Sequence, residues 1–275
     1  MNFSRRVRSV QKKTNSLLCV GLDPDIARLP RSIRNAGDPL AAFCRAIIDA
    51  TADLACAYKI NLAFFEAHGV SGLRSMEQVL QRIPSGVLSI GDGKRGDIGN
   101  SAAMYARGLF RDFGFDAVTV SPYMGEDSVL PFLANRSKGA FVLALTSNKG
   151  AADFQYLRSG KKRLYQHVVA RAESWNGKRN CGLVVGATKP SELRRIRTMV
   201  PTMPILIPGI GAQGGDLRSS VRYGCTAKGD LALLNVGRTI LYASSGKNFD
   251  AAARSSAEQV RDEINHHRKL RFKRS

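Results

Sequence analysis

The fold is decided by the stretch "GVLSIGDGKRGDIGNSAAMYARGLF" (86–110), which joins an apolar run, a charged turn and a helical pattern. The apolar run in 86–94 lacks strict alternation, which is typical of a parallel strand buried on both faces. It ends in the charged residues of "GDGKRGDIGN" (91–100), and 101–110 have helical periodicity. The stretch therefore predicts a β-strand followed by an α-helix, with charges at the carboxyl end of the strand.

The same unit recurs along the chain. Apolar runs predict strands at 17–23, 55–62, 86–94, 117–122, 139–147, 181–188, 203–211 and 231–238, and helical patterns lie between them, as at 39–52, 76–83, 101–110 and 191–199. Eight alternations in 275 residues predict an α/β fold, a (β/α)8 TIM barrel with parallel strands. A doubly wound open sheet is the competing architecture.

No linker or low-complexity segment divides the chain, so we expect one domain over 1–275 with basic N- and C-terminal segments. Apolar residues make up 44% and charged residues 23%, which indicates a folded protein, and the net charge is +20. Solvated surface charge is the favoured interpretation of the basic ends; contact with nucleic acid or acidic membranes is the alternative. The polar stretch "TSNKGAADFQYLRSGKKRLYQ" (146–166) predicts a long loop.

The cysteines and histidines predict no metal site. The five cysteines are odd in number, lie mostly in apolar runs and form no C-x-x-C pair, so they are interpreted as reduced core residues of a cytosolic protein. The Arg-rich start lacks the apolar stretch of a signal peptide, and no apolar run is long enough to span a membrane. A cytoplasmic location is expected, with an organellar transit peptide as the alternative.

Polar residues gather at the ends of the predicted strands, where the reactive groups of a TIM barrel belong. These residues are Asp23, Lys59, Asn61, Asp92, Lys94, Ser121, Thr146, Ser147, Thr188, 209–213, Gly237 and Arg238. The last two strands lead into "IPGIGAQGGD" (207–216) and "NVGRTI" (235–240). Glycine backbone N–H groups and an arginine can hold an anion, so these two loops predict a phosphate site.

The charged turn itself has two interpretations. Along an extended strand end, Asp92 and Lys94 are two residues apart and project to the same face, into the mouth of the barrel. Asp97 lies beyond the turn, at the start of the next helix. The alternative is a helix-capping aspartate with a surface salt bridge.

The motifs of the chain together resemble the orotidine 5′-phosphate decarboxylase family, in its longer bacterial subgroup (type 2). The resemblance rests, in the family's order, on "LLCVGLDPD" (17–25), "KINLAFFEAHG" (59–69), "DGKRGDIGNSA" (92–102), "LALTSNKGA" (143–151), "VVGAT" (184–188), "IPGIGAQGGD" (207–216) and "NVGRTILYAS" (235–244). It implies the last step of pyrimidine nucleotide synthesis, decarboxylation of orotidine 5′-monophosphate to uridine 5′-monophosphate, without metal or organic cofactor. A homodimer with shared active sites is also implied.

The resemblance implies a role for each matched residue. Asp92 would lie against the substrate carboxylate, Lys94 would stabilise and protonate the pyrimidine C6 carbanion, and Lys59 would bond the ribose. Asp97 and Ser101 would act in the site of the neighbouring subunit. The remaining substrate contacts would come from Asp23, Ser147, Gln213, Gly237 and Arg238.

Three positions depart from the family's usual residues: Gly93 replaces alanine, Ser101 replaces threonine, and "NVGR" (235–238) lacks a serine before the arginine. Gly93 keeps the small volume, Ser101 keeps the hydroxyl, and "NVGR" keeps a backbone donor before the arginine. The nearest alternative function is a magnesium-dependent aldol reaction of the hexulose-6-phosphate synthase type, whose additional acidic residue is not found here. Specific nucleic-acid binding is not expected, since the basic termini contain only Phe3 and Phe272 for base stacking.

Overall fold

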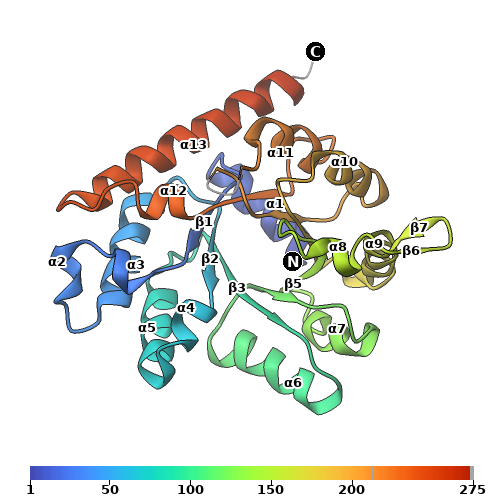
Figure 1. The fold of residues 1–275 in the computed structure, drawn as a ribbon, viewed down its shortest axis with the longest axis horizontal. Helices are drawn as coiled ribbons and strands as arrows, with labels where there is room; N and C mark the ends of the chain where they lie inside the picture. Colours follow the sequence, from blue (N-terminus) through green and yellow to red (C-terminus); the bar gives the residue numbers. More distant parts are fainter. Residues whose placement is uncertain (212–213, 273–275) are drawn as a thin grey trace.

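In the computed structural model, which describes residues 1–211 and 214–272, parallel strands close into a barrel surrounded by helices (Figure 1). The barrel strands are β1 (Leu18–Leu22), β2 (Ala57–Asn61), β3 (Leu88–Arg95), β4 (Ala117–Val120), β5 (Gly139–Leu145), β8 (Cys181–Val185), β9 (Ile205–Ile207) and β10 (Ala232–Val236). Because β1 pairs with both β2 and β10, the sheet has no edge. The predicted barrel is confirmed, and the open-sheet alternative is wrong.

Strand parity separates two apolar cores. One set of alternate strand residues, including Cys19, Ala57 and Leu88, fills the inside of the barrel, while the other set packs against the helices. Both faces of each strand are thus buried, which explains why the strands lack an alternating polar pattern. All five cysteines are free and buried, as the apolar runs around them predict.

Two helices of the outer ring start at an aspartate whose side chain caps them. Asp38 caps α3 (Pro39–Thr51) by accepting from Ala41 N, and Asp216 caps α11 (Leu217–Gly224) through Ser219 N. Other helices on the barrel are α5 (Gly69–Arg82), α6 (Gly99–Arg107), α7 (Glu126–Leu133), α9 (Leu164–Ser174), α10 (Pro190–Met199) and α13 (Phe249–Phe272). The short helices are α2 (Arg31–Arg34), α4 (Ala63–Glu66), α8 (Ala151–Phe154) and α12 (Arg238–Leu241). The helix predicted over 76–83 begins earlier, at Gly69, and the one predicted over 101–110 continues as a π-helical turn at Gly108–Asp112.

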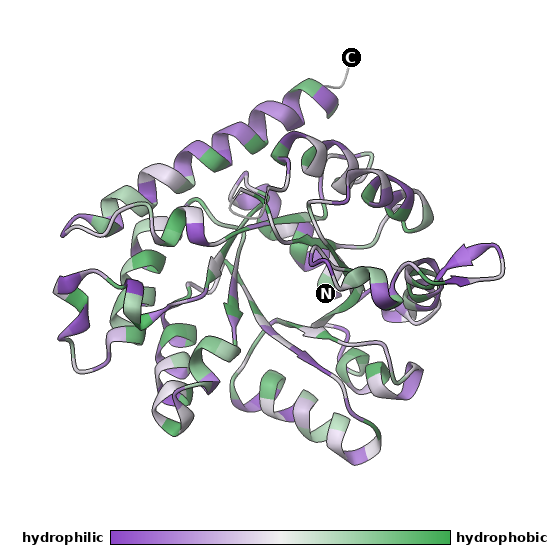
Figure 2. Ribbon diagram, in the orientation of Figure 1, coloured by the Kyte–Doolittle hydropathy of each residue, from purple (hydrophilic) through white to green (hydrophobic). Residues whose placement is uncertain are grey.

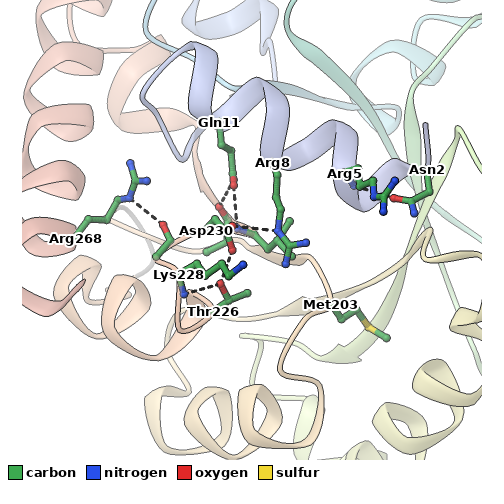
Figure 3. A network of polar contacts seen from close by, with 12 residues as sticks. Asn2, Arg5, Arg8, Gln11, Met203, Thr226, Lys228, Asp230 and Arg268 are labelled. Carbon is green, nitrogen blue, oxygen red and sulfur yellow. Dashed lines mark hydrogen bonds and ion pairs between the residues drawn. The ribbon is translucent and has the colours of Figure 1, made fainter. Parts of the chain in front are cut away.

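The basic N-terminal segment is a structural element. It forms α1 (Phe3–Lys13), which buries Phe3, Val7 and Val10 in the inner core at the amino ends of the strands. Gln11 Nε2 donates to Ala232 O at 2.8 Å, and Gln11 Oε1 accepts from Leu231 N at 2.9 Å, as seen on the underside of α1 in Figure 3. The helix therefore closes this end of the barrel.

Basic side chains of α1 also form ion pairs. Arg6 Nη1 lies 2.6 Å from Asp116 Oδ1, and Arg8 Nε lies 3.1 Å from Asp230 Oδ2. The interpretation of the basic ends as solvated surface charge is therefore wrong for these two arginines. Their carboxylate partners come from segments distant in sequence, which the sequence pattern does not reveal.

The long loop predicted over 146–166 has secondary structure of its own. It contains α8 and a hairpin of β6 (Arg158–Ser159) and β7 (Lys162–Arg163), and α9 starts at Leu164. The hairpin projects from the ring of helices and is hydrophilic (Figure 2). Gln155 Oε1 accepts from Thr146 N at 2.8 Å, so this insertion holds the backbone at the end of β5.

Candidate active site

A cavity of about 390 Å³ opens at the carboxyl ends of the barrel strands. Its lining combines charged groups, hydroxyls and amides with a few apolar side chains: Asp23, Lys59, Asn61, Asp92, Lys94, Thr119, Leu143, Thr146, Ser147, Asn148, Val184, Leu206, Pro208, Gly209 and Asn235. Five of the ten predicted site residues therefore share one cavity: Asp23, Lys59, Asp92, Lys94 and Ser147.

Acidic and basic side chains alternate across the cavity floor. Lys59 Nζ lies 2.9 Å from Asp92 Oδ2 and 3.6 Å from Asp23 Oδ1. On the other side of the same carboxylate, Lys94 Nζ lies 2.7 Å from Asp92 Oδ1. Lys59 is 4% exposed, whereas the side chain of Lys94 is 49% exposed to the cavity and solvent. Lys94 is thus the cation of this array that is accessible to a bound molecule.

The array keeps its charges because each buried group faces groups of opposite sign. Burial by itself would lower the pKa of Lys59, but Asp23 and Asp92 outweigh burial and raise that pKa above its usual value. Burial would likewise raise the pKa of Asp92, yet Lys59 and Lys94 hold that pKa well below its usual range. The cavity therefore contains fixed charges of both signs at neutral pH.

Asp23 is placed to accept a hydrogen bond from a bound molecule. Its Oδ1 atom is buried and has no hydrogen-bond partner within the part of the chain that the structure describes. The backbone around it is anchored, since the Tyr242 hydroxyl donates to Asp23 O at 3.0 Å and accepts from Asp25 N at 2.8 Å. A buried acceptor in a polar cavity favours a ligand with hydroxyl groups.

Asp92 and Lys94 lie at the same cavity, as predicted, but not through regular strand geometry. The β3–β4 register shifts between Gly91 and Arg95, and Lys94 has a left-handed φ of 46°. The backbone therefore bulges at the charged turn, and the ammonium of Lys94 folds back onto the Asp92 carboxylate.

The two loops predicted to bind phosphate lie against each other. A Cβ atom added to Gly211 would lie 3.0 Å from Thr239 Oγ1. A Cβ atom added to Gly237 would lie 3.6 Å from Asp23 Oδ2. Gly209 and Gly211 have positive φ, a conformation that suits glycine. Gly237 and Arg238 are not among the residues that line the cavity, and Gln213 lies outside the described residues.

Asp97 and Ser101 lie apart from the charged array. They line a second hollow of about 560 Å³ beside α6, together with apolar side chains that include Met104 and Tyr105. The Asp97 side chain does not cap α6. Its Oδ1 accepts instead from the backbone N of the next residue, Ile98, at 2.8 Å. Among the described residues, no hydrogen bond or ion pair joins Asp97 or Ser101 to Asp92 or Lys94, and the two pairs line different hollows.

Arg95, the remaining charge of the turn, has local partners. Its guanidinium forms an ion pair with Glu66 and lies 5.5 Å from the ring centroid of Tyr105. Arg95 therefore ties the turn to α4 and α6.

Sequence reasoning missed Asn148, which follows Ser147 in the loop after β5, and two polar strand residues that line the same cavity, Thr119 and Asn235. Both were hidden inside runs that were interpreted as apolar strands. Strand parity could have found them, because Thr119 follows the inward-facing Ala117 by two residues and Asn235 follows the inward-facing Leu233 by two. Asn235 Oδ1 accepts from the Cys19 thiol at 3.6 Å.

The described residues contain neither a metal-binding cluster nor a helix suited to span a membrane. Within 1–211 and 214–272, no three His, Cys, Asp or Glu side chains gather closely enough to hold a metal ion. Among the helices of the same ranges, none is both long and apolar enough to cross a membrane.

Comparison with known proteins gives the family. The model of the orotidine 5′-phosphate decarboxylase / HUMPS family matches residues 16–253. A curated orotidine 5′-phosphate decarboxylase of Dehalococcoides mccartyi is 49% identical over 273 residues, which cover 98% of this chain and 99% of the relative.

Solved structures are similar over the same length. The OMP decarboxylase of Leishmania donovani is 40% identical with a TM-score of 0.86, covering 98% of this chain and 99% of that chain. The UMP synthase of Leishmania donovani is 42% identical with a TM-score of 0.88, and the match covers 98% of this chain but 57% of that longer chain. Together with the family match, these similarities show that the chain belongs to the orotidine 5′-phosphate decarboxylase family.

Proposed function

We propose that the chain decarboxylates orotidine 5′-monophosphate to uridine 5′-monophosphate by cofactor-free chemistry with Lys94 as the proton donor. The bond between C6 and the carboxylate breaks, its electron pair stays on C6, and CO₂ leaves. The Lys94 ammonium stabilises the developing charge and then transfers a proton to C6; the neutral amine recovers a proton from water. The observation that carries the proposal is the alternating array in which Lys94 is both accessible and 2.7 Å from Asp92.

The array supports this chemistry because its charges are set before the substrate binds. A carbanion-like state gains most from a cation that needs no reorganisation during the reaction. We propose that Asp92 lies against the substrate carboxylate and that Lys59 and Asp23 bind the ribose. Asp23 Oδ1 is buried and lies 3.6 Å from Lys59 Nζ, but it accepts no hydrogen bond from the described residues, which favours a hydroxyl donor at that position.

We further propose that the phosphate binds beside Gly237 and Arg238, with Gln213 completing that loop and Ser147 contacting the pyrimidine edge. A Cβ added to Gly211 would lie 3.0 Å from Thr239 Oγ1, so the two loops are close enough to bind one anion. Binding energy from a remote phosphate can be used at the reacting carbon. Single-domain organisation over 1–275 and a cytoplasmic location are parts of the same proposal.

We propose a homodimer in which Asp97 and Ser101 complete the partner's site. Two observations support it. The hollow that holds both residues is distinct from the charged cavity, and the adjacent surface exposes apolar side chains, with Ile98 56% and Met104 57% exposed. An exposed apolar patch around functional polar groups is typical of a protein–protein interface.

The proton-donor role is tested by turnover in D₂O. Wild-type protein should consume orotidine 5′-monophosphate, followed by ultraviolet absorbance, and give product with deuterium at C6. Lys94→Ala should lose about 10²–10⁴-fold or more in kcat, the range of a lost general acid. Lys138→Ala, which removes a lysine at the opposite end of the barrel, is the matched control. Undiminished turnover by Lys94→Ala would refute the proposed role.

Chelation tests the cofactor-free part of the proposal. Turnover should be unchanged after dialysis against EDTA. Loss of turnover that magnesium restores would instead support the metal-dependent aldol class of the same fold.

Subunit mixing tests the shared site. Lys94→Ala and Asp97→Ala subunits should each be inactive, and their hybrid dimers should regain activity because one of the two sites is intact. Failure to recover activity, after exchange is verified by mass spectrometry, would show that Asp97 acts within its own chain or not at all.

A further inference from the structure

The β3–β4 pairing contains an irregularity at the charged turn. Gly91 pairs with Val118, and the next pair joins Arg95 to Val120. Three residues of β3, Asp92 to Lys94, therefore lie opposite Thr119 alone. A bulge of this kind leaves backbone groups without ladder partners and redirects side chains.

The Thr119 side chain fills the gap in the ladder. Lys94 N donates to Thr119 Oγ1 at 2.9 Å, and Thr119 Oγ1 in turn donates to Asp92 Oδ1 at 2.9 Å. A hydroxyl has one proton and two lone pairs, so both bonds form at once, with the proton directed to the carboxylate, which only accepts. Thr119 is 1% exposed, which protects these bonds from competition with water.

The two hydrogen-bond partners of Thr119, the Lys94 backbone and the Asp92 carboxylate, must both be held in place for the array to keep its geometry. Lys94 has a φ of 46°, an uncommon backbone conformation for a side chain other than glycine, asparagine or aspartate. Backbone strain of this kind persists when the surroundings determine it. Among the described residues, the Asp92 carboxylate accepts hydrogen bonds from three side chains. Two of these donors are the ammonium groups of Lys59 and Lys94, and the third, the Thr119 hydroxyl, is uncharged.

We propose that Thr119 is a positioning residue for the reaction, whose hydroxyl fixes the Lys94 backbone and the Asp92 carboxylate relative to each other. The inference rests on the proposed function. Thr119 acts through its two neighbours. When a cation must meet one carbon atom, a misplacement of about 1 Å can cost on the order of 100-fold in rate.

The first variant is Thr119→Val, which keeps the shape of the side chain and removes the hydroxyl. We expect kcat to fall about 100-fold. The Kd of uridine 5′-monophosphate should stay within about twofold, because Thr119 is not among the residues proposed to contact its ribose and phosphate. Thr119→Ser should restore kcat to within a few-fold of wild type, since it returns the hydroxyl. This split between kcat and product affinity distinguishes positioning from a general loss of structure.

Thr226→Val is the matched control. Thr226 donates to Asp230 below α1, at the amino end of the barrel (Figure 3). The variant therefore also breaks a Thr–Asp hydrogen bond, but neither residue lines the cavity. It should lower Tm while kcat stays unchanged. If Thr119→Val is insoluble, Thr119→Cys keeps a weak donor and should give an intermediate kcat.

Three results would overturn the inference: Thr119→Val with wild-type kcat, a proportional loss of kcat and nucleotide binding, or failure of Thr119→Ser to restore kcat. These results are distinguishable from failure of the proposed function. In that case Lys94→Ala would retain turnover, whatever Thr119→Val does.

Discussion

At the carboxyl end of the barrel, Asp92 lies between Lys59 and Lys94; at the amino end, Asp116 lies between Arg6 and Lys138. Both carboxylates are surrounded by two cations and are largely buried. The amino end is covered by α1, and Asp116 lines neither of the two hollows beside that helix, whereas Asp92 lines the cavity of about 390 Å³ at the carboxyl end. The comparison shows that a charge cluster becomes a candidate for catalysis when space for a substrate adjoins it.

The balance of charge also differs between the two ends. Lys59 faces two carboxylates, and its pKa is raised although burial alone would lower it. Lys138 shares Asp116 with Arg6, and burial, aided by that like charge, lowers its pKa. The two carboxylates beside Lys59 therefore outweigh the effect of burial on its pKa, whereas the one carboxylate beside Lys138 does not.

The largest expected effect comes from the closed end. Phe3→Ala should lower the free energy of unfolding by about 3–5 kcal/mol, because Phe3 is fully buried and packs edge-on against Phe141 at the bottom of the inner core. Turnover per folded molecule should stay unchanged. Urea unfolding and active-site titration measure the two quantities separately. A fall in kcat without loss of stability would show that the ends are not independent.

The second change, Asp92→Asn at the carboxyl end of the barrel, should lower kcat and leave the fold intact. Removing the charge between Lys59 and Lys94 should lower kcat about 10²–10³-fold, as for loss of one preorganised electrostatic group. Steady-state kinetics give the value, and circular dichroism checks the fold. A variant with near wild-type kcat would place the chemistry elsewhere.

Asp116→Asn is the corresponding change at the amino end. It removes an ion pair with Arg6 while an amide oxygen can still accept from Ser89 N, so we expect a loss of about 1–3 kcal/mol in unfolding free energy. The kcat should not change. If Asp116→Asn instead matched Asp92→Asn in kcat, the proposed contrast between the two ends would be wrong.

The smallest effect is in pH dependence. Because the pKa of Asp92 is lowered, its ionisation stabilises the fold above the usual carboxyl pKa, and that contribution is lost as the pH falls through the lowered value. Lys59 has a raised pKa, so its contribution is present below the usual lysine pKa and is lost only as the pH rises through the raised value.

Between about pH 5 and 9, both groups therefore stay charged. The difference in unfolding free energy between wild type and Asp92→Asn should be constant over this range and should shrink below about pH 4. Urea unfolding at several pH values measures it. A change centred near neutral pH would mean that the array titrates there.

Much of the site followed from the sequence because strand periodicity is local. Buried runs ending in polar residues located Asp23, Lys59 and Asp92 at one end of the barrel, and the structure places them in one cavity. Thr119 and Asn235 escaped notice because each is one polar residue inside a buried run. Their inward direction follows from counting by two along the strand, but only after the inward face is known.

By itself, the sequence determined the repeated strand–helix units, the barrel they form and the chemical groups at the strand ends. These depend on hydrophobic periodicity and residue type, which are local properties. The tertiary structure decided that α1 closes the barrel, and that a bulge held by Thr119 turns Lys94 onto Asp92. Both depend on partners more than 20 residues away, Thr119 lying 25 residues from Lys94, and such pairings have no signature in a local pattern.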